Sequence, residues 1–278
     1  MRLKVEILPI IASVVLLMII GLAIAAPLFA PYDPLKQNLR SRLTPPSWME
    51  GGKPEYILGT DQLGRDILSR IIYGTRVSCI VGLAVVMVSG VLGVVLGIIS
   101  GFYEGWFSNI VMRLCDLQSA LPFTLMAILI MSVMGAGLVN VIFALSITGW
   151  MGYARLIRGQ TLQVKQFEFV KASKLLGAKD IHLMFKQILP NVITHAIILA
   201  AFSVAQTMIT EAGLTFLGLG VEPSIPSWGG MLSDGRAYME TGWWITVIPG
   251  LCIMITVMAV NTIGQWAREI FDPRSSKY

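Results

Sequence analysis

Five long runs without Asp, Glu, Lys or Arg alternate with polar segments along the chain. The runs are residues 7–32, 77–103, 117–154, 187–210 and 241–267. A helix needs about 20 apolar residues to cross a bilayer, so each run is long enough for one span. The third run is long enough for two, with Gly135, Gly137 and Asn140 marking the turn between them. The pattern therefore predicts an all-α integral membrane protein with about six transmembrane helices.

The first run has two interpretations. Arg2 and Lys4 precede it, and Ala23-Ile24-Ala25 imitates the cleavage site of a signal peptide. The run is longer than the apolar core of a typical signal peptide, so we expect a retained span over residues 7–30. Residues 31–76 are rich in proline and glycine, which favours a turn-rich excursion over a compact domain. We therefore divide the chain into residues 1–76, a span with its extramembrane segment, and residues 77–278, the transmembrane core.

Composition agrees with this class and excludes several functions. The 278 residues are 55% hydrophobic and 13% charged, with a mean hydropathy of +0.73, as in membrane proteins. The net charge of +5 is spread over membrane-flanking loops, so we expect no nucleic acid partner. Cys79, Cys115 and Cys252 lie in or beside apolar runs without metal-ligand spacing, so we expect neither disulfides nor a metal site.

One polar stretch, residues 167–191, interrupts the apolar runs. Its apolar residues recur at roughly helical spacing, which predicts two short helices with Gly177 at the corner and Pro190 closing the second. The apolar positions are Val170, Leu175, Leu176, Ile181, Met184 and Phe185. Helices this short and this charged cannot span a bilayer. Their apolar stripe must therefore lie on the membrane surface or in a groove of a soluble partner, and the pattern alone leaves both open.

Charge predicts the orientation. Residues 155–186 hold seven Lys or Arg against Glu168 and Asp180, which is the strongest positive-inside signal in the chain. With an even number of spans both termini share this cytoplasmic side, where Arg2, Lys4, Arg268, Arg274 and Lys277 agree with it. Residues 31–76 also hold seven Lys or Arg, but with five acids, and we expect this longer loop outside.

Glu211 is the ionisable residue expected deepest in a span, near the outer interface of the helix that ends at about Phe216. It either lines or gates a pore, or it pairs internally or reaches outward to the interface. The apolar, glycine- and proline-rich segment that follows, residues 215–232, favours a re-entrant or interfacial element. Glu211, Phe216 and Trp228 are therefore candidates for a pore or outer gate.

Three stretches carry a resemblance to a known family. Lys171-Ala172-Ser173, Gly177 and Leu189-Pro190 resemble the EAA loop of the permease subunits of binding-protein-dependent ABC importers. Two positions depart from the family's loop: Lys171 replaces its leading Glu, and Gln187 stands where an apolar residue is usual. Residues 58–82 and 215–232 resemble segments of dipeptide, oligopeptide and nickel permeases, so the resemblance covers nearly the whole chain from Pro31 onward.

The resemblance implies a type I ABC importer-like fold and an ATP-driven solute importer of the bacterial inner membrane, with this chain forming half of the pore. The loop over residues 155–190 would be its coupling loop to the ATPase. Its contact residues would be Lys171, Ala172, Ser173, Leu175, Leu176, Gly177, Ala178, Ile181 and Pro190. The implied partners are a second homologous permease subunit, two cytoplasmic ATP-binding subunits that hold ATP and Mg, an extracytoplasmic solute-binding protein and the lipid bilayer. The cargo would be peptides, nickel or other metal chelates, or glutathione-like compounds.

A self-contained secondary transporter or channel is the alternative. The sequence contains no P-loop. Gly59 and Gly64 with Arg65-Asp66 resemble one in their glycine spacing, but the Lys-Ser/Thr pair that a P-loop requires is missing. We therefore expect no catalytic site and no cofactor in this chain. A secondary transporter needs a proton or ion relay inside the membrane, for which Glu211 is the candidate.

Overall fold

The computed structural model describes residues 7–271, which form helices joined by turns and contain no strand beyond a single bridge between Thr60 and Asp66. The α-helices are α1 (Ile7–Ile24), α2 (Ala26–Phe29), α3 (Ile67–Phe102), α4 (Trp106–Ser119), α5 (Phe123–Met134), α6 (Leu138–Val164), α7 (Glu168–Leu175), α8 (Asp180–His182), α9 (Leu189–Phe216), α10 (Trp228–Gly235) and α11 (Trp244–Phe271). Shorter turns are the 3-10 helices η1 (Leu39–Ser41) and η3 (Arg236–Tyr238) and the π-helical turn η2 (Leu183–Ile188). The predicted all-α fold is confirmed.

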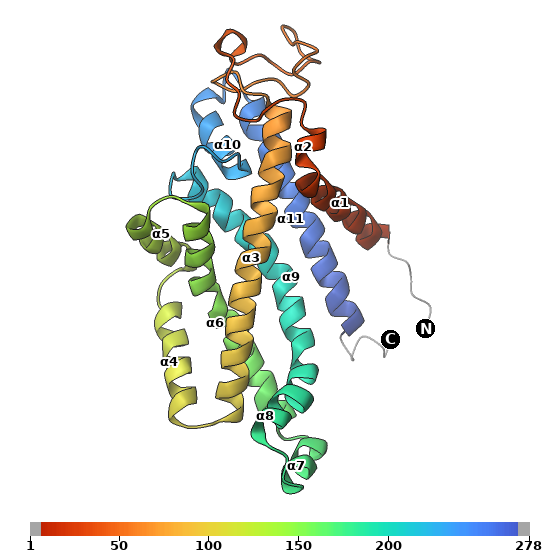
Figure 1. The fold of residues 1–278 in the computed structure, drawn as a ribbon, viewed down its shortest axis with the longest axis vertical. Helices are drawn as coiled ribbons and strands as arrows, with labels where there is room; N and C mark the ends of the chain where they lie inside the picture. The colour runs from red at the N-terminus through yellow and green to blue at the C-terminus, as the bar shows by residue number, and fades with distance from the viewer. Residues whose placement is uncertain (1–6, 272–278) are drawn as a thin grey trace.

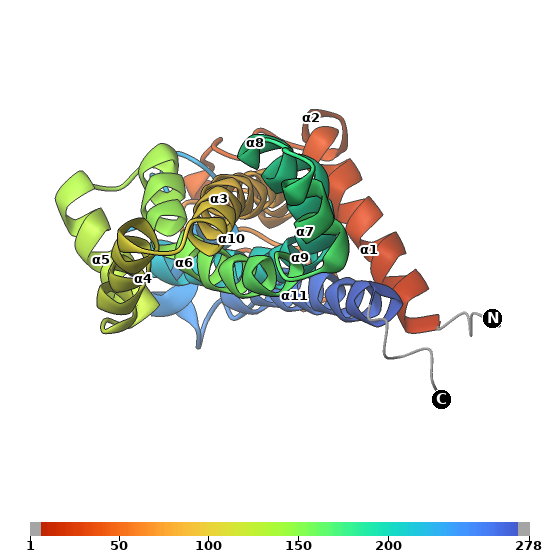
Figure 2. The ribbon, with the colours of Figure 1, turned by 90° about the horizontal axis from the view of Figure 1, so that it is seen from below.

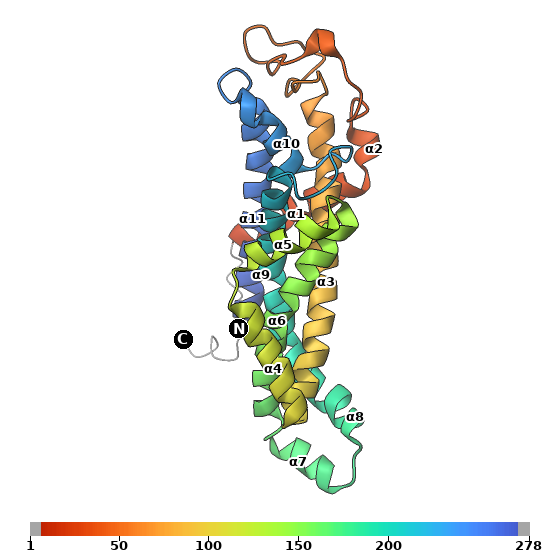
Figure 3. The ribbon, with the colours of Figure 1, turned by 90° about the vertical axis from the view of Figure 1, so that its left-hand side faces the viewer.

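The molecule is an elongated bundle in which α3 runs along most of the length (Figure 1). Helices α6 and α9 lie beside α3, and α11 lies beside α9, while α1 lies at the edge next to α11 (Figures 1 and 2). Residues 31–66 lie at one end of the bundle, and α7 and α8 project from the other (Figures 1 and 3). The two polar segments of the sequence are therefore separated by the full length of the bundle.

The apolar runs form the expected spans, with one marked irregularity. Helices α1, α3 and α11 and the continuous helix Asp180–Phe216 are each long and apolar enough to cross a membrane. Helices α4 and α5 together make a fifth candidate, bent by 89° at the break that contains Pro122, where proline prevents a continuous helix. Helix α6 is 27 residues long but too polar to count among these candidates, and its polar residues Ser146, Thr148 and Thr161 are buried. By length and hydropathy, the described residues thus contain four to five candidate spans, so the predicted number of about six is approximate.

Glycine allows α3 and α6 to approach closely. A methyl group added at Gly93 would lie 2.4 Å from the carbonyl oxygen of Trp150, and one at Gly97 would lie 2.9 Å from that of Ala154. A methyl group added at Gly101, one turn further, would lie 2.7 Å from the Cβ of Thr161 and 3.0 Å from the carbonyl oxygen of Arg158. Spacing of four residues places these three glycines on one face of α3, where backbones can pack without side chains between them.

Residues 31–66 fold back onto the bundle. They contain turns and no α-helix, as the proline and glycine content predicts, but they are packed rather than free. Leu43, Met49 and Leu58 contact a core formed by the start of α3 with α10 and α11, and the indole Nε1 of Trp244 donates a hydrogen bond of 3.0 Å to the carbonyl oxygen of Thr60. The proposed division at residue 76 falls inside α3, which begins at Ile67 after its N-cap, Asp66. The described residues therefore show no break in the fold at that position.

Candidate functional site

The segment between α6 and α9, residues 165–188, forms a hairpin that we call the polar hairpin. Helix α7 starts with Glu168 in its first turn and ends with Lys174 in its last, so both charges complement the helix dipole. Gly177 has φ +81; its N–H donates to the carbonyl of Lys174, and the N–H of Ala178 donates to that of Ser173. This pair of bonds is a Schellman motif, which requires a left-handed residue after the helix. The predicted corner at Gly177 is thus confirmed.

The second arm differs from the expectation. Pro190 does not close a short helix, because the helix Asp180–Phe216 passes through it without a break. The π-helical turn η2 lies immediately before the proline. Proline cannot donate a hydrogen bond and its ring crowds the carbonyl four residues earlier, and a widened turn relieves both problems. Likewise residues 155–164 of the expected loop belong to α6, so the hairpin is shorter than residues 155–190.

The polar hairpin has two faces with different surroundings. Val170, Leu183, Met184 and Ile188 are buried in one core with Ile98 and Phe102 of α3. Leu175 and Leu176 at the tip are 89% and 88% exposed, and Ile181 is 68% exposed. The single apolar stripe expected from the spacing is therefore wrong: part of it packs inside the chain and the rest forms an uncovered apolar tip.

The structure gathers most of the predicted loop residues at this tip. Lys171, Ala172, Leu175, Leu176, Gly177 and Ile181 are exposed, and Ser173 and Ala178 are half-buried. Ser173 accepts a hydrogen bond of 2.7 Å from the Nε2 of Gln187, which ties α7 to η2. Gln187, the departure from the family's apolar residue, thus makes a contact that an apolar side chain cannot make. Pro190 lies apart from the tip, at the start of α9.

Two polar contacts connect the hairpin to the end of α3. The Tyr103 hydroxyl donates to Asp180 Oδ2 at 2.9 Å. This hydrogen bond, with a smaller effect of burial, raises the pKa of Tyr103. Lys165 Nζ donates to the carbonyl oxygen of Phe102 at 2.8 Å and to Glu104 Oε1 at 3.1 Å, and it lies 5.7 Å from the centre of the Phe102 ring.

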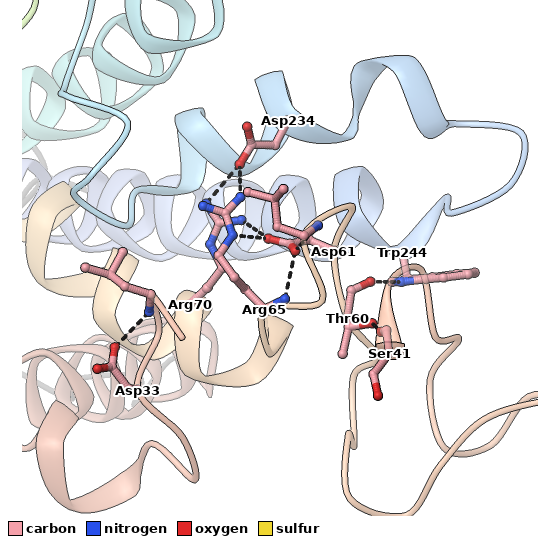
Figure 4. A network of polar contacts seen from close by, with 10 residues as sticks. Asp33, Ser41, Thr60, Asp61, Arg65, Arg70, Asp234 and Trp244 are labelled. Carbon is pink, nitrogen blue, oxygen red and sulfur yellow. Dashed lines mark hydrogen bonds and ion pairs between the residues drawn. The ribbon is translucent and has the colours of Figure 1, made fainter. Parts of the chain in front are cut away.

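At the opposite end of the bundle a buried network of charges joins residues 31–66 to α3 and α10 (Figure 4). Asp61 is fully buried and accepts hydrogen bonds from Arg65 Nε at 2.6 Å and from Arg70 Nη1. Asp234 of α10, which is one-third exposed, accepts from Arg65 Nη2 at 2.8 Å and from Arg70 Nη2 at 3.0 Å. Next to it, burial raises the pKa of Asp66 although hydrogen bonds from Ser69 oppose the shift. The network clamps three segments that are distant in sequence.

The candidate gate residues each have a partner inside the chain. Glu211 is fully buried; its Oε1 accepts 2.9 Å from the Thr215 hydroxyl, while its Oε2 has no hydrogen-bond partner. Phe216 is half-buried under the guanidinium of Arg236 at 5.6 Å. Trp228 is buried, and its Nε1 donates 3.1 Å to the carbonyl of Ile71 on α3. The three side chains lie on α9 and α10, and none of these contacts joins one of them to another.

Sequence reasoning missed the charge network and the ties to α3. Asp61, Arg65 and Arg70 were visible as a cluster of charges before a span, but Asp234 lies 164 residues after Arg70. The available signal was Asp234 itself, a charge two residues after the apolar segment 215–232. Within residues 7–271 no group of three or more His, Cys, Asp or Glu side chains is arranged to hold a metal ion.

Comparison with known proteins gives a consistent result along the chain. Residues 93–277 match the family described as "Binding-protein-dependent transport system inner membrane component", and residues 2–46 match "N-terminal TM domain of oligopeptide transport permease C". The chain is 42% identical over 259 residues to the di/tripeptide transport system permease protein DppC of Pseudomonas aeruginosa, covering 93% of this chain and 86% of that protein. It is 40% identical over 264 residues to the dipeptide transport system permease protein DppC of Haemophilus influenzae, covering 95% and 90%. It is 37% identical over 263 residues to the glutathione transport system permease protein GsiD of Pectobacterium atrosepticum, covering 95% and 86%.

Proposed function

The chain belongs to the family of inner membrane components of binding-protein-dependent transport systems, and from this premise we propose that it forms half of a pore through which short peptides are imported. It is a multi-pass membrane protein and a permease subunit, a class that is not itself catalytic. The energy for transport then comes from two ATP-binding partner subunits, which carry ATP and Mg.

The exposed tip of the polar hairpin is the observation that supports this coupling. Helix α3 has 36 residues, a length of about 54 Å, whereas the hydrocarbon core is about 30 Å thick. The hairpin projects beyond the end of α3 (Figure 1), so its tip lies outside the depth that lipid tails can cover. Leu175, Leu176 and Ile181, surrounded by lysines, form an apolar patch that only a further protein would bury at this position. We assign that protein as the ATPase.

The orientation follows from the same assignment. The hairpin end is cytoplasmic, and residues 31–66 face the solute-binding protein on the outside. The ends of α1 at Ile7 and of α11 at Phe271 both point toward the hairpin end (Figure 1), which supports cytoplasmic termini. Arg268 lies in the last turn of α11 and agrees with this, whereas Arg2, Lys4, Arg274 and Lys277 lie outside the described residues.

A second, related permease subunit completes the pore in this proposal. An apolar groove of about 300 Å³ between α3 and α9 supports a helical neighbour, since its lining residues, among them Val91, Val94 and Ile197, offer hydrophobic contacts. For the cargo, the relatives above are named for di/tripeptides, dipeptides and glutathione. We therefore propose a short peptide or a peptide-like compound, with a nickel or other metal chelate as the alternative cargo.

A self-contained secondary transporter is less well supported. Its ion relay would depend on Glu211, and this side chain is fully buried and hydrogen-bonded to Thr215 one turn away on the same helix. Family membership and the uncovered tip both favour the ATP-driven importer. A purified chain that transports solute without ATP or partner subunits would reverse this preference.

The test replaces Leu175 and Leu176 together by Ser. Burial of a leucine side chain is worth about 1.5–3 kcal/mol, so loss of both weakens ATPase binding by about 100-fold or more. Co-purification of the ATPase subunits and peptide uptake should both be lost. The matched control is Leu39→Ser, which removes an exposed leucine (64% exposed) at the opposite end. Undiminished ATPase co-purification with the double variant would refute the assignment of the tip.

Gly177 offers a second test of the same assignment. At its φ of +81 a bulky side chain is strained, although no neighbouring atom lies within 4 Å of an added methyl group. Gly177→Leu should therefore alter the shape of the hairpin without disturbing the bundle, and should leave ATP hydrolysis running without transport. Normal uptake in this variant would contradict the role of the hairpin in coupling.

A further inference from the structure

We infer that the polar hairpin drives α3 as well as the two helices to which it is joined in sequence, and that Tyr103 and Lys165 are the positioning residues that connect them. The inference rests on the proposed coupling to an ATPase. The chain leads directly from α6 into the hairpin and from the hairpin into α9, so sequence alone identifies only those two helices as moving with it. Helix α3 ends at Phe102, far earlier in the chain.

The first connection attaches α3 to the second arm of the hairpin. Tyr103 follows the last residue of α3, and Asp180 is the first residue of α8. The hydroxyl of Tyr103 donates to Asp180 Oδ2 at 2.9 Å across 77 residues of sequence. The bond is exposed to solvent, but its acceptor is a carboxylate, which makes it stronger than a bond to a neutral oxygen, and it joins α8 to the end of α3.

The second connection attaches α3 to the first arm. Lys165 is the C-cap of α6, where the hairpin begins, and its Nζ donates to the carbonyl oxygen of Phe102. This carbonyl belongs to the last turn of α3, where helix dipoles favour a cation. Glu104 Oε1 at 3.1 Å and the Phe102 ring add two further contacts to the same ammonium group. The end of α3 is therefore bonded to both arms of the hairpin.

Packing makes α3 respond as a rigid body. Phe102 and Ile98 share one buried core with Val170 and Leu183 of the hairpin. Gly93, Gly97 and Gly101 hold α3 directly against α6 over the adjoining three turns, where an added methyl group would lie within 3 Å of α6. A displacement applied at the hairpin thus moves α3 and α6 together, since close-packed interfaces do not deform gradually.

At its other end, α3 is bonded to the outer charge network, which would therefore move with it. Arg70 lies in the first turn of the helix and donates to both Asp61 and Asp234, in the network that clamps residues 31–66 to α10. One continuous helix of about 54 Å thus connects the ATPase-facing hairpin to the charge network on the side where the solute enters. Movement of α3 changes the position of Arg70 relative to Asp234, and so opens or closes the contact between α10 and the outer segment.

The experiment measures ATP hydrolysed per peptide transported, in the complete complex with its partner subunits reconstituted in liposomes. Tyr103→Phe removes the donor and should raise this ratio about fivefold, the effect of one hydrogen bond. Asp180→Asn retains an acceptor oxygen and should stay near wild type, whereas Asp180→Ala should match Tyr103→Phe. Lys165→Met should raise the ratio further, and Lys165→Arg, which keeps charge and donors, should restore most of the coupling.

The matched control is Thr262→Val. It also removes a hydroxyl that donates to one backbone carbonyl, that of Met258 at 2.8 Å, but on α11, away from both the hairpin and the outer segment. Its ratio should equal that of wild type. All variants should co-purify with normal amounts of ATPase subunits, which separates loss of coupling from loss of assembly. Unchanged ratios in Tyr103→Phe and Lys165→Met would overturn the inference.

A cross-linking experiment tests whether the hairpin and the end of α3 stay together during transport. The double variant Tyr103→Cys with Asp180→Cys should be uncoupled until a short bifunctional thiol reagent joins the two positions, and coupling should then return. If the joined complex stays uncoupled or stops transporting, the hairpin and α3 must move apart, and the inference fails. Failure here with a positive Leu175 and Leu176 test would refute only the role of α3, whereas a negative result in both would refute the proposed function.

Discussion

Replacing Asp61 by Ala tests whether the outer charge network holds residues 31–66 onto the bundle. Asp61 is fully buried and accepts from both arginines, whose side chains are 8% and 3% exposed. It also accepts from the backbone N–H groups of Leu63 and Arg65, each at 2.9 Å. Its removal leaves two buried guanidinium groups with only Asp234, which is partly exposed, as a counter-charge.

The magnitude follows from this burial. Removing one partner of a buried ion pair costs about 3–5 kcal/mol, because the remaining charge is left uncompensated. Taking 3 kcal/mol, the population in which residues 31–66 have opened rises more than about 100-fold. The effect is local, since the ion pairs join this segment to the start of α3 and to α10 (Figure 4).

Hydrogen–deuterium exchange measures this opening directly. The amides of Thr60, Asp61 and Ile67 donate to backbone carbonyls within the segment and exchange only when it opens. In Asp61→Ala we expect their exchange to be about 100-fold faster, with exchange of the hairpin amides unchanged. Because the calculation uses the lower end of the range, the predicted acceleration is a minimum.

The control removes a charge that is exposed rather than buried. Asp116 pairs with Arg155 at 2.7 Å, but these side chains are 69% and 41% exposed, so the pair contributes about 0–1 kcal/mol. Asp116→Ala should leave exchange at residues 58–67 unchanged. Exchange in Asp61→Ala within threefold of wild type would show that the network does not hold the segment, and the clamp would have to be abandoned.

Three further predictions follow from individual contacts. Gly97→Leu forces a side chain between α3 and α6 and should lower the free energy of unfolding by about 1–3 kcal/mol. Gly152→Ala, with open space around the glycine, should raise it by about 0.5–1 kcal/mol. Thermal unfolding in detergent compares the two variants, and equal unfolding midpoints would contradict the close packing of α3 and α6. Thr215→Val removes the hydroxyl that donates to buried Glu211 and should cost about 1–3 kcal/mol in the same assay, with no shift contradicting the bond. Because the pKa of Tyr103 is raised, its protonated, hydrogen-bonded form should persist above pH 10 and be lost as the pH rises through the raised value. The difference in tyrosinate absorbance between wild type and Tyr103→Phe should therefore titrate above pH 10. A midpoint at or below pH 10 would refute the contact with Asp180.

Local features of the sequence were sufficient for much of the fold. The apolar runs predicted the spans because a bilayer admits few alternatives to a helix of sufficient length. Gly135 ends α5 and Gly137 caps the start of α6, both with positive φ, at the turn expected between these two helices. Gly177 forms the corner of the hairpin for the same reason. Each of these depends on a residue and its immediate neighbours.

The predictions that failed concern patterns that are compatible with two different structures. The spacing of Val170, Leu175 and Leu176 was read as one stripe, yet Val170 is buried and both leucines are exposed at the tip. Pro190 was expected to stop a helix, but the π-helical turn before it lets the helix continue. Periodicity shows which side chains share a face, and only the packed neighbours decide which part of that face is covered.

The sequence by itself determined that this is a helical membrane protein with a basic hairpin and a turn-rich segment, because hydropathy, charge and backbone permissiveness act over a few residues. The tertiary structure decided the long-range partners: Arg70 with Asp234, Tyr103 with Asp180, and three glycines of α3 with the backbone of α6. Such pairs have no local signature, because their members are far apart in the sequence. They form only when the folded bundle brings the two members of each pair within contact distance.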